Sequence, residues 1–172
     1  MAKPGIEFVI TGGTIDSFYD GTKDNVVTSG ESILPEVMGL IKPSTPLVFS
    51  TVCMKDSRNL SKHDLANILE TIQQSKYSKI IVTHGTYTMP DTARFLQANL
   101  KVIDKTIILT GSLIPIKGFS PSDGTFNLGY AMAQAEHLAP GVYVAMNAKV
   151  FSPEEVVKRI TEGTFKSILG EK

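Results

Sequence analysis

The sequence predicts a doubly wound α/β domain whose mostly parallel sheet is covered by helices on both faces, giving three layers. Short, nearly continuous apolar runs are typical of strands buried on both sides. Segments with helical periodicity lie between these runs, and the strand-helix-strand order recurs four times, which indicates crossover connections in a parallel sheet. At ~150 residues per domain, the 172 residues predict a single domain over residues 1–172.

Apolar runs rich in β-branched residues define the strands. In chain order they are Ile6–Thr11, Pro46–Met54, Lys79–Thr83, Thr106–Thr110 and Val142–Met146. The first run ends at a Gly-Gly pair, and polar segments follow nearly every run. Since ligands of open α/β sheets bind beyond the carboxyl ends of the strands, this edge is where we expect a functional site.

The helices are predicted from apolar spacing and from residues that begin or end helices. They are Glu31–Ile41, Lys62–Ser75, Pro90–Leu100, Ser122–Leu138 and the short Pro153–Ile160. Ser61 is a plausible N-cap for the second helix and Ser152 for the last. The polar segment Gly12–Gly30 has no periodicity, and a loop of that length is typical of a lid or a binding loop.

Composition excludes several functional classes. Lys plus Arg and Asp plus Glu are 17 each, which argues against a nucleic-acid partner or an anionic membrane surface. The lone Cys53 excludes a disulfide within the chain and any multi-cysteine metal site. His63, His84 and His137 are far apart, so no metal and no cofactor is expected. No apolar stretch approaches the ~20 residues that span a bilayer, and no signal peptide is visible, so we expect a cytoplasmic protein.

Threonine dominates the polar segments that follow the strands. Thr14 and Thr86 each follow a glycine, Gly13 and Gly85, after the first and third predicted strands. Glycine lets backbone N–H groups approach a ligand, and a hydroxyl becomes a nucleophile when a nearby tyrosine or desolvated lysine takes its proton. A turn residue whose hydroxyl caps a backbone group explains Thr14 as well, and the residues alone leave both interpretations open.

Collinear motifs along nearly the whole chain resemble one known family. They are Thr11-Gly12-Gly13-Thr14-Ile15, Asp56-Ser57-Arg58-Asn59-Leu60, His84-Gly85-Thr86-Tyr87-Thr88-Met89, Leu109-Thr110-Gly111-Ser112, Ser122-Asp123-Gly124 and Phe126-Asn127-Leu128. Each motif is weak alone, but their shared order and spacing are similar to the amino-terminal domain of bacterial-type L-asparaginases. The family also has short one-domain relatives, which the Gly13-Thr14-Ile15-Asp16 opening with a nearby tyrosine resembles.

The resemblance implies a flavodoxin-like sheet, often in a homo-oligomer such as a dimer, that hydrolyses the side-chain amide of asparagine or a related small amide to acid and ammonia. It implies that Thr14 is the nucleophile, that Thr86 holds or activates the attacking species and that Lys158 is the catalytic lysine. Ser57 matches a ligand of the substrate carboxylate. Tyr19, in the Gly12–Gly30 segment, is the candidate for the tyrosine that activates the nucleophile.

Further substrate-binding residues are expected beside these positions. They are Gly13, Gly85, Tyr87, Arg58 and Ser112. Two assignments keep a second interpretation: Tyr19 also fits a residue that anchors its loop, and Lys158 also fits a solvated lysine on a short amphipathic helix.

Two features depart from the family pattern. Tyr87 stands where the family has an aspartate that binds the α-amino group of the substrate. A phenol offers no negative charge to an ammonium at neutral pH. The second domain, which in longer relatives supplies residues to a neighbouring subunit's pocket, is not expected after Lys172. Three functions therefore compete: an amidohydrolase that is weak or altered in substrate, a small-molecule binding domain without turnover, and a structural or regulatory partner.

Overall fold

A six-stranded sheet forms the centre of the computed structural model, which describes residues 2–170. The strand order is β4 (Leu47–Lys55), β1 (Lys3–Gly12), β5 (Tyr77–Thr83), β6 (Thr106–Thr110), β7 (Gly141–Met146) and β8 (Lys149–Phe151). All neighbours pair in parallel except β7 and β8, which are antiparallel. The five parallel strands follow the flavodoxin-like order 2-1-3-4-5, so the predicted fold is confirmed.

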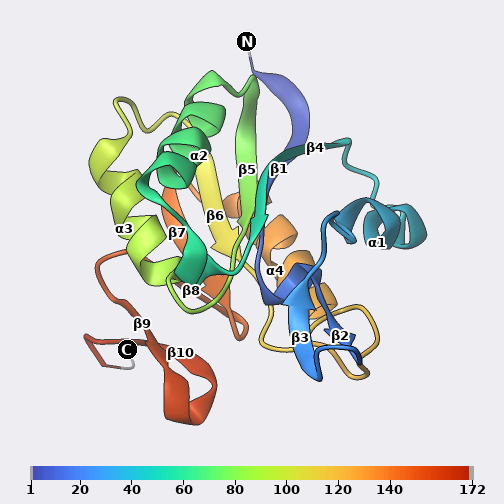
Figure 1. Cartoon of the computed structure of the whole chain (residues 1–172). Coiled ribbons are helices and arrows are strands. Elements are labelled where there is room, and N and C mark those ends of the chain that lie inside the picture. The colour runs from blue at the N-terminus through green and yellow to red at the C-terminus, as the bar shows by residue number, and fades with distance from the viewer. Residues whose placement is uncertain (1, 171–172) are drawn as a thin grey trace.

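Helices cover both faces of this sheet (Figure 1). Their bounds are α1 (Leu34–Ile41), α2 (Lys62–Gln74), α3 (Met89–Asn99) and α4 (Gly124–His137). Helices α2 and α3 pack on one face and α1 and α4 on the other. Side chains of β1 alternate between the faces, since Val9 contacts the α2–α3 cluster whereas Phe8 and Ile10 contact the α1–α4 cluster.

Local signals in the sequence explain where the helices begin. Ser61 and Asp64 form a reciprocal capping box at the start of α2, which confirms the predicted N-cap. Pro90 lies in the first turn of α3. The first helix begins at Leu34, later than expected from Glu31, because the backbone N–H of Ile33 donates to the buried carboxylate of Asp16. None of the helices in the described part of the chain has the length and apolar composition required to cross a bilayer.

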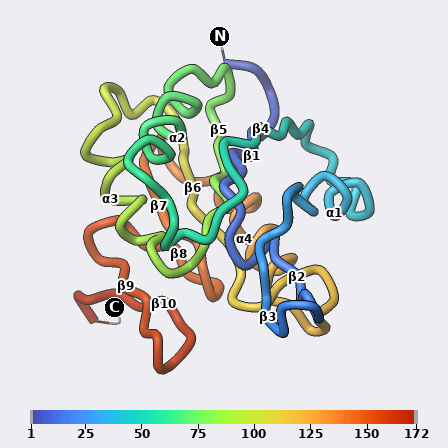
Figure 2. Tube along the Cα trace, viewed as in Figure 1, coloured from blue at the N-terminus to red at the C-terminus, as the bar shows by residue number. Residues whose placement is uncertain are grey.

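Two small hairpins extend below the carboxyl end of the sheet, one on each side (Figure 2). Strands β2 (Ser17–Asp20) and β3 (Asn25–Thr28) form the first, within the segment expected to be a lid or a binding loop. Strands β9 (Val156–Arg159) and β10 (Thr164–Ser167) form the second. The hairpins carry Tyr19 and Lys158 respectively, so these two residues lie on different sides of the molecule.

The predicted helix Pro153–Ile160 is wrong, because its second half is strand β9, which pairs antiparallel with β10. Val156 packs into the core beside Phe165 of β10. The β-branched Val156 and Val157 fit a strand better than a helix. The Glu155 carboxylate accepts hydrogen bonds from Ser152 N–H and the Ser167 hydroxyl, which ties the turn before β9 to the end of β10.

Candidate active site

A cavity of about 220 Å³ lies where β4, β1 and β5 end. It is lined by Gly13, Thr14, Asp56, Ser57, Arg58, Gly85, Thr86, Tyr87 and Lys158. The first eight belong to the segments that follow these three adjacent strands, and Lys158 comes from β9. The β1–β5 junction is the point at which the strand order reverses, where doubly wound proteins bind ligands.

Glycines bring these segments into contact. A Cβ atom added to Gly13, whose φ is +82°, would lie 2.4 Å from the backbone N of Gly85. A Cβ atom on Gly85 would lie 2.7 Å from the Ser57 hydroxyl oxygen. No side chain fits at either position without displacing backbone, so the Gly13 and Gly85 motifs are required for the close approach of the turns.

Thr14 begins a 3₁₀ turn, η1 (Thr14–Asp16), directly after β1. The turn is fixed because Ser17 donates its hydroxyl to the Gly13 carbonyl at 2.9 Å, and Gly13 N–H donates to the Lys55 carbonyl at 2.9 Å. The buried Asp16 carboxylate accepts from the Ser32 hydroxyl at 2.8 Å. Burial raises the pKa of Asp16, although its hydrogen bonds to Ser32 and Ile33 act in the opposite direction.

Lys158 and Thr86 form the polar contact that links the hairpin to the sheet edge. The Lys158 ammonium donates to the Thr86 hydroxyl, with 2.7 Å between Nζ and Oγ1. Burial lowers the pKa of Lys158, and the nearby positive charge of Arg58 lowers it further, while Asp56 acts in the opposite direction. A lysine in a strand that touches a cavity threonine is not the solvated helical lysine of the alternative interpretation.

The hairpin that carries Lys158 is anchored to the domain at several points. Arg94 of α3 donates to the Val156 carbonyl at 2.7 Å. Phe165 N–H donates to the Asn147 side-chain oxygen at 2.9 Å. Asn147 and Ala148 have φ of 54° and 58° and form the turn between β7 and β8. These contacts hold Lys158 at the cavity.

Asp56 is a cavity residue that sequence analysis did not assign to the site. Its Oδ1 accepts from Arg58 Nε at 3.0 Å and its Oδ2 from Arg58 Nη2 at 2.8 Å. The Arg58 guanidinium lowers the pKa of Asp56. The sequence did contain a clue, since Asp56 closely follows a predicted strand and lies two positions before Arg58. The pairing of their side chains, however, depends on the η2 turn (Ser57–Asn59), which Asp56 caps.

Tyr87 places an aromatic ring beside two cations. The centroid of the ring lies 5.6 Å from Arg58 Cζ and 6.0 Å from Lys158 Nζ. Both separations are within cation–π range. The Tyr87 side chain is half exposed at 52%, so it forms part of the wall at the mouth of the cavity.

The structure places two other predicted site residues away from this cavity. Tyr19 is exposed, and its hydroxyl donates to Asp24 within the β2–β3 hairpin, an arrangement that fits the loop-anchor interpretation. Ser112 is fully buried and does not line the cavity. Among the described residues, its hydroxyl has no hydrogen-bond partner.

His84 supports the site from beneath. Its ring is fully buried, with Nδ1 2.8 Å from the Gly85 carbonyl and Nε2 2.9 Å from the Thr92 hydroxyl of α3. Burial lowers the pKa of His84 to about 4, so the ring is neutral near pH 7. Residues 2–170 contain no group of three or more His, Cys, Asp or Glu side chains placed to hold a metal ion.

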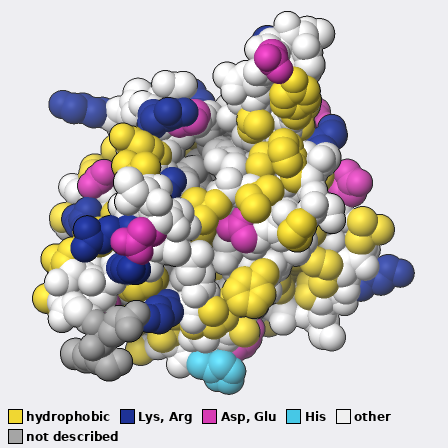
Figure 3. Space-filling model, turned by 90° about the horizontal axis from the view of Figure 1, so that it is seen from below, with side chains coloured by type: hydrophobic (Ala, Val, Ile, Leu, Met, Phe, Trp, Pro, Cys, Tyr) yellow, Lys and Arg dark blue, Asp and Glu magenta, His cyan; other side chains and the backbone are white. Residues whose placement is uncertain are grey.

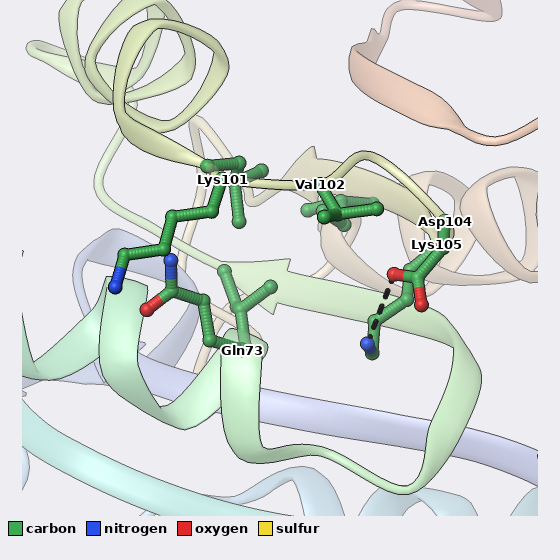
Figure 4. Close-up of a pocket in the computed structure, with 8 residues that line it drawn as sticks. Gln73, Lys101, Val102, Asp104 and Lys105 are labelled. Atoms are coloured by element: carbon green, nitrogen blue, oxygen red, sulfur yellow. Dashed lines mark hydrogen bonds and ion pairs between the residues drawn. The ribbon is translucent and has the colours of Figure 1, made fainter.

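A second cavity, of about 260 Å³, lies at the amino end of β6 (Figure 4). Its walls include the apolar Ile72, Leu100 and Val102, and Lys105 forms an ion pair of 3.1 Å with Asp104. Its described lining residues include no threonine, serine or glycine, so it offers no hydroxyl nucleophile. The opposite, carboxyl-end face carries intermixed basic, acidic and hydrophobic side chains (Figure 3).

Comparisons with known proteins agree with this geometry. Residues 5–169 match the family model "Asparaginase, N-terminal". The chain is 32% identical to L-asparaginase 2 of Escherichia coli over 98% of this chain and 51% of that protein. It is 33% identical to the glutaminase-asparaginase of Acinetobacter glutaminasificans over 92% of this chain and 50% of that protein. The chain therefore spans about half the length of the curated relatives it matches.

Solved structures show the same similarity. A probable cytoplasmic L-asparaginase from Campylobacter jejuni superposes with a TM-score of 0.79 at 30% identity, over 96% of this chain and 53% of that chain. L-asparaginase I from Vibrio cholerae superposes with a TM-score of 0.81 at 26% identity, over 96% and 52% of the two chains. Both comparisons cover the sheet and the cavity at its carboxyl edge.

Proposed function

Since the chain belongs to the asparaginase N-terminal family, we propose that its carboxyl-edge cavity hydrolyses the carboxamide of a small substrate to a carboxylate and ammonia. The observation that carries this proposal is the contact between Lys158 and Thr86 in the cavity that Thr14 also lines. A hydroxyl, a second hydroxyl and a partly desolvated amine in one small cavity are the groups that acyl transfer to a threonine requires.

In the proposed reaction, the Thr14 hydroxyl oxygen attacks the amide carbon, and a C–O bond forms. The tetrahedral intermediate collapses, the C–N bond breaks, and the proton from Thr14 ends on the departing nitrogen to give ammonia. Water then attacks the acyl carbon, the ester bond to Thr14 breaks, and the hydroxyl recovers its proton. Backbone N–H groups of the Gly85–Thr86 turn would stabilise the negative oxygen of each intermediate.

Lys158 and Thr86 would accept and return the proton of the Thr14 hydroxyl in the two steps. In its neutral form, the Lys158 amine accepts a proton through the Thr86 hydroxyl, to which it is already hydrogen-bonded. The lowered pKa of Lys158 increases the fraction of neutral amine. In its protonated form, the same amine stabilises negative charge on a nearby oxygen. Tyr19 keeps its predicted role only if the β2–β3 hairpin moves, because Tyr19 now donates to Asp24.

The small amide is the partner that this proposal names. A homo-oligomer and a cytoplasmic location remain predictions, the second favoured by the Campylobacter jejuni neighbour described as a probable cytoplasmic L-asparaginase. The three competing functions differ in one observable, since only the amidohydrolase releases ammonia.

Ammonia release from a panel of primary amides tests the proposal directly. The panel holds L-asparagine, L-glutamine and succinamate, and each is offered to the parent chain and to Thr14→Ala. We expect release by the parent and a loss of about 10³-fold or more in Thr14→Ala, the scale on which removal of a nucleophile acts. Equal turnover by both proteins would refute the assignment of Thr14, and no turnover of any amide would favour a binding role.

A further inference from the structure

The charged groups of the cavity limit which amides it accepts. Its charged lining residues are one carboxylate, Asp56, and two cations, Arg58 and Lys158. Both Asp56 oxygens already accept from Arg58, so its charge is neutralised within the wall. The part of the cavity that residues 2–170 form is therefore positive when Lys158 is protonated and neutral when it is not, and in neither state do these residues give it an unpaired negative charge.

Tyr87 reinforces this limit by its position. Its ring lies against both cations, 5.6 Å from Arg58 Cζ and 6.0 Å from Lys158 Nζ. A substrate ammonium beside Tyr87 would therefore lie near the positive charge of protonated Lys158 and near a ring that two cations already approach. An ammonium placed there loses part of its hydration and gains no ionic partner, which is unfavourable.

We propose that the substrate is the half-amide of a small dicarboxylic acid, an amide that carries a carboxylate and no α-ammonium group. This inference rests on the proposed amide hydrolysis and names its substrate class. The carboxylate is attracted by protonated Lys158, the cation of the cavity that is not paired with Asp56, and the Ser57 hydroxyl lies in the same wall. Succinamate is the simplest member of the class, because it is L-asparagine without the α-ammonium, and a cavity of about 220 Å³ admits a molecule of that size.

Hydrolysis of a half-amide balances without any further reactant. The amide C–N bond breaks, water supplies the new C–O bond, and the products are a dicarboxylate and ammonium. The leaving group and the reacting carbon are the same in succinamate and L-asparagine. Any difference in their kcat/KM therefore reports on recognition of the ammonium and not on chemistry.

The test compares kcat/KM for succinamate and L-asparagine in the parent chain, Tyr87→Asp and Tyr87→Phe. We expect the parent to prefer succinamate at least ~10-fold, which is about 1.4 kcal/mol. Tyr87→Asp supplies a carboxylate for the ammonium and should reverse the preference, whereas Tyr87→Phe keeps the ring and should retain it. A parent chain that uses L-asparagine as well as succinamate, or a preference unchanged in Tyr87→Asp, would overturn the proposal.

A calorimetric titration separates failure of this inference from failure of the proposed hydrolysis. The parent chain is titrated with succinate and with L-aspartate, which differ only in the ammonium. If no amide is hydrolysed, tighter binding of succinate still supports the substrate charge assigned to the cavity. Equal or tighter binding of L-aspartate, or binding of neither, would overturn it.

Discussion

The neighbours of Lys158 lower the pKa of its amine. Lys158 lies in a strand, donates to Thr86 and, like Arg58, lies near the Tyr87 ring. Burial and the Arg58 charge both favour its neutral form. In the proposed function, the amine that donates to Thr86 is what would make this hydroxyl a route for the proton. The sequence alone therefore does not show that Lys158 differs from other lysines. Its position beside Thr86 and Arg58 is what predicts that it accepts a proton.

The lowered pKa of Lys158 predicts how the rate depends on pH. If the neutral amine is the active form, the rate should rise with pH as Lys158 loses its proton, with a midpoint below the ordinary 10.5. Lys158→Met removes the acceptor and should lower kcat by about 10²-fold or more, and Lys158→Arg, which stays charged, should not rescue it. The measurement is kcat against pH, with Lys62→Met, an exposed lysine of α2, as the control. A parent-like pH profile in Lys158→Met would contradict the role.

At the scale of elements, the site depends on turns and hairpins more than on the sheet. Strands β1 and β5 provide rigid ends, but Thr14 is positioned by the η1 turn and Lys158 by the β9–β10 hairpin. The hairpin turn contains Gly163, whose φ is +60°. Glycine adopts this conformation without the cost that a side chain brings.

Two glycine-to-alanine substitutions should therefore have opposite effects on stability. Gly163→Ala strains the hairpin and should lower the free energy of unfolding by roughly 1 kcal/mol. Gly129→Ala, within helix α4 and with no atom within 4 Å of the added Cβ, should raise it by roughly 0.5–1 kcal/mol. Urea denaturation measures both. Only Gly163→Ala should also reduce amide turnover, and a loss of turnover in Gly129→Ala alone would contradict this account of the hairpin.

The sequence predicted the sheet well because the strand signal is local. Runs such as Thr106–Thr110 are apolar enough to be strands whatever surrounds them. Residues 153–160 were mistaken for a helix because Ser152 and the acidic residues after it resemble a helix start. The partner that makes Val156–Arg159 a strand lies at Thr164–Ser167, and no local pattern reports that pairing.

Prediction of the site was limited in the same way. Glycine motifs pointed to Gly13 and Gly85, and both line the cavity, because close backbone approach requires glycine. The pairing of Asp56 with Arg58 depends on side-chain direction in a short 3₁₀ turn. The placement of Tyr19 depends on a hairpin that periodicity did not reveal. Side-chain direction is a property of the folded chain rather than of spacing.

For the whole molecule, acid stability should depend on His84. In the unfolded chain the pKa of His84 is near 6.5, whereas burial lowers it to about 4 in the folded protein. Because the pKa is lower in the folded protein, the free energy of unfolding rises with pH between about 4 and 6.5. The same stability is lost as the pH falls from 6.5 towards 4. At about 1.4 kcal/mol per pH unit, the loss is at most about 3 kcal/mol.

Urea denaturation between pH 4 and pH 7 checks this expectation. His84→Gln has no titrating ring and should show a smaller decline of unfolding free energy over that range than the parent chain. His63→Gln, an exposed position at the start of α2, should keep the parental decline. If His84→Gln declines as steeply as the parent, the buried neutral ring is not the source of acid sensitivity.

Formation of an acyl group on Thr14 is the central claim, and partitioning between water and hydroxylamine tests it most directly. The substrates are the amide that the chain hydrolyses fastest and the methyl ester of the same acid. Both would pass through one acyl-Thr14 intermediate, so the ratio of hydroxamate to acid should be the same for the two substrates, and Thr14→Ala should form neither product. Ratios that differ between amide and ester, or hydroxamate formed by Thr14→Ala at the parental rate, would contradict acyl transfer through Thr14.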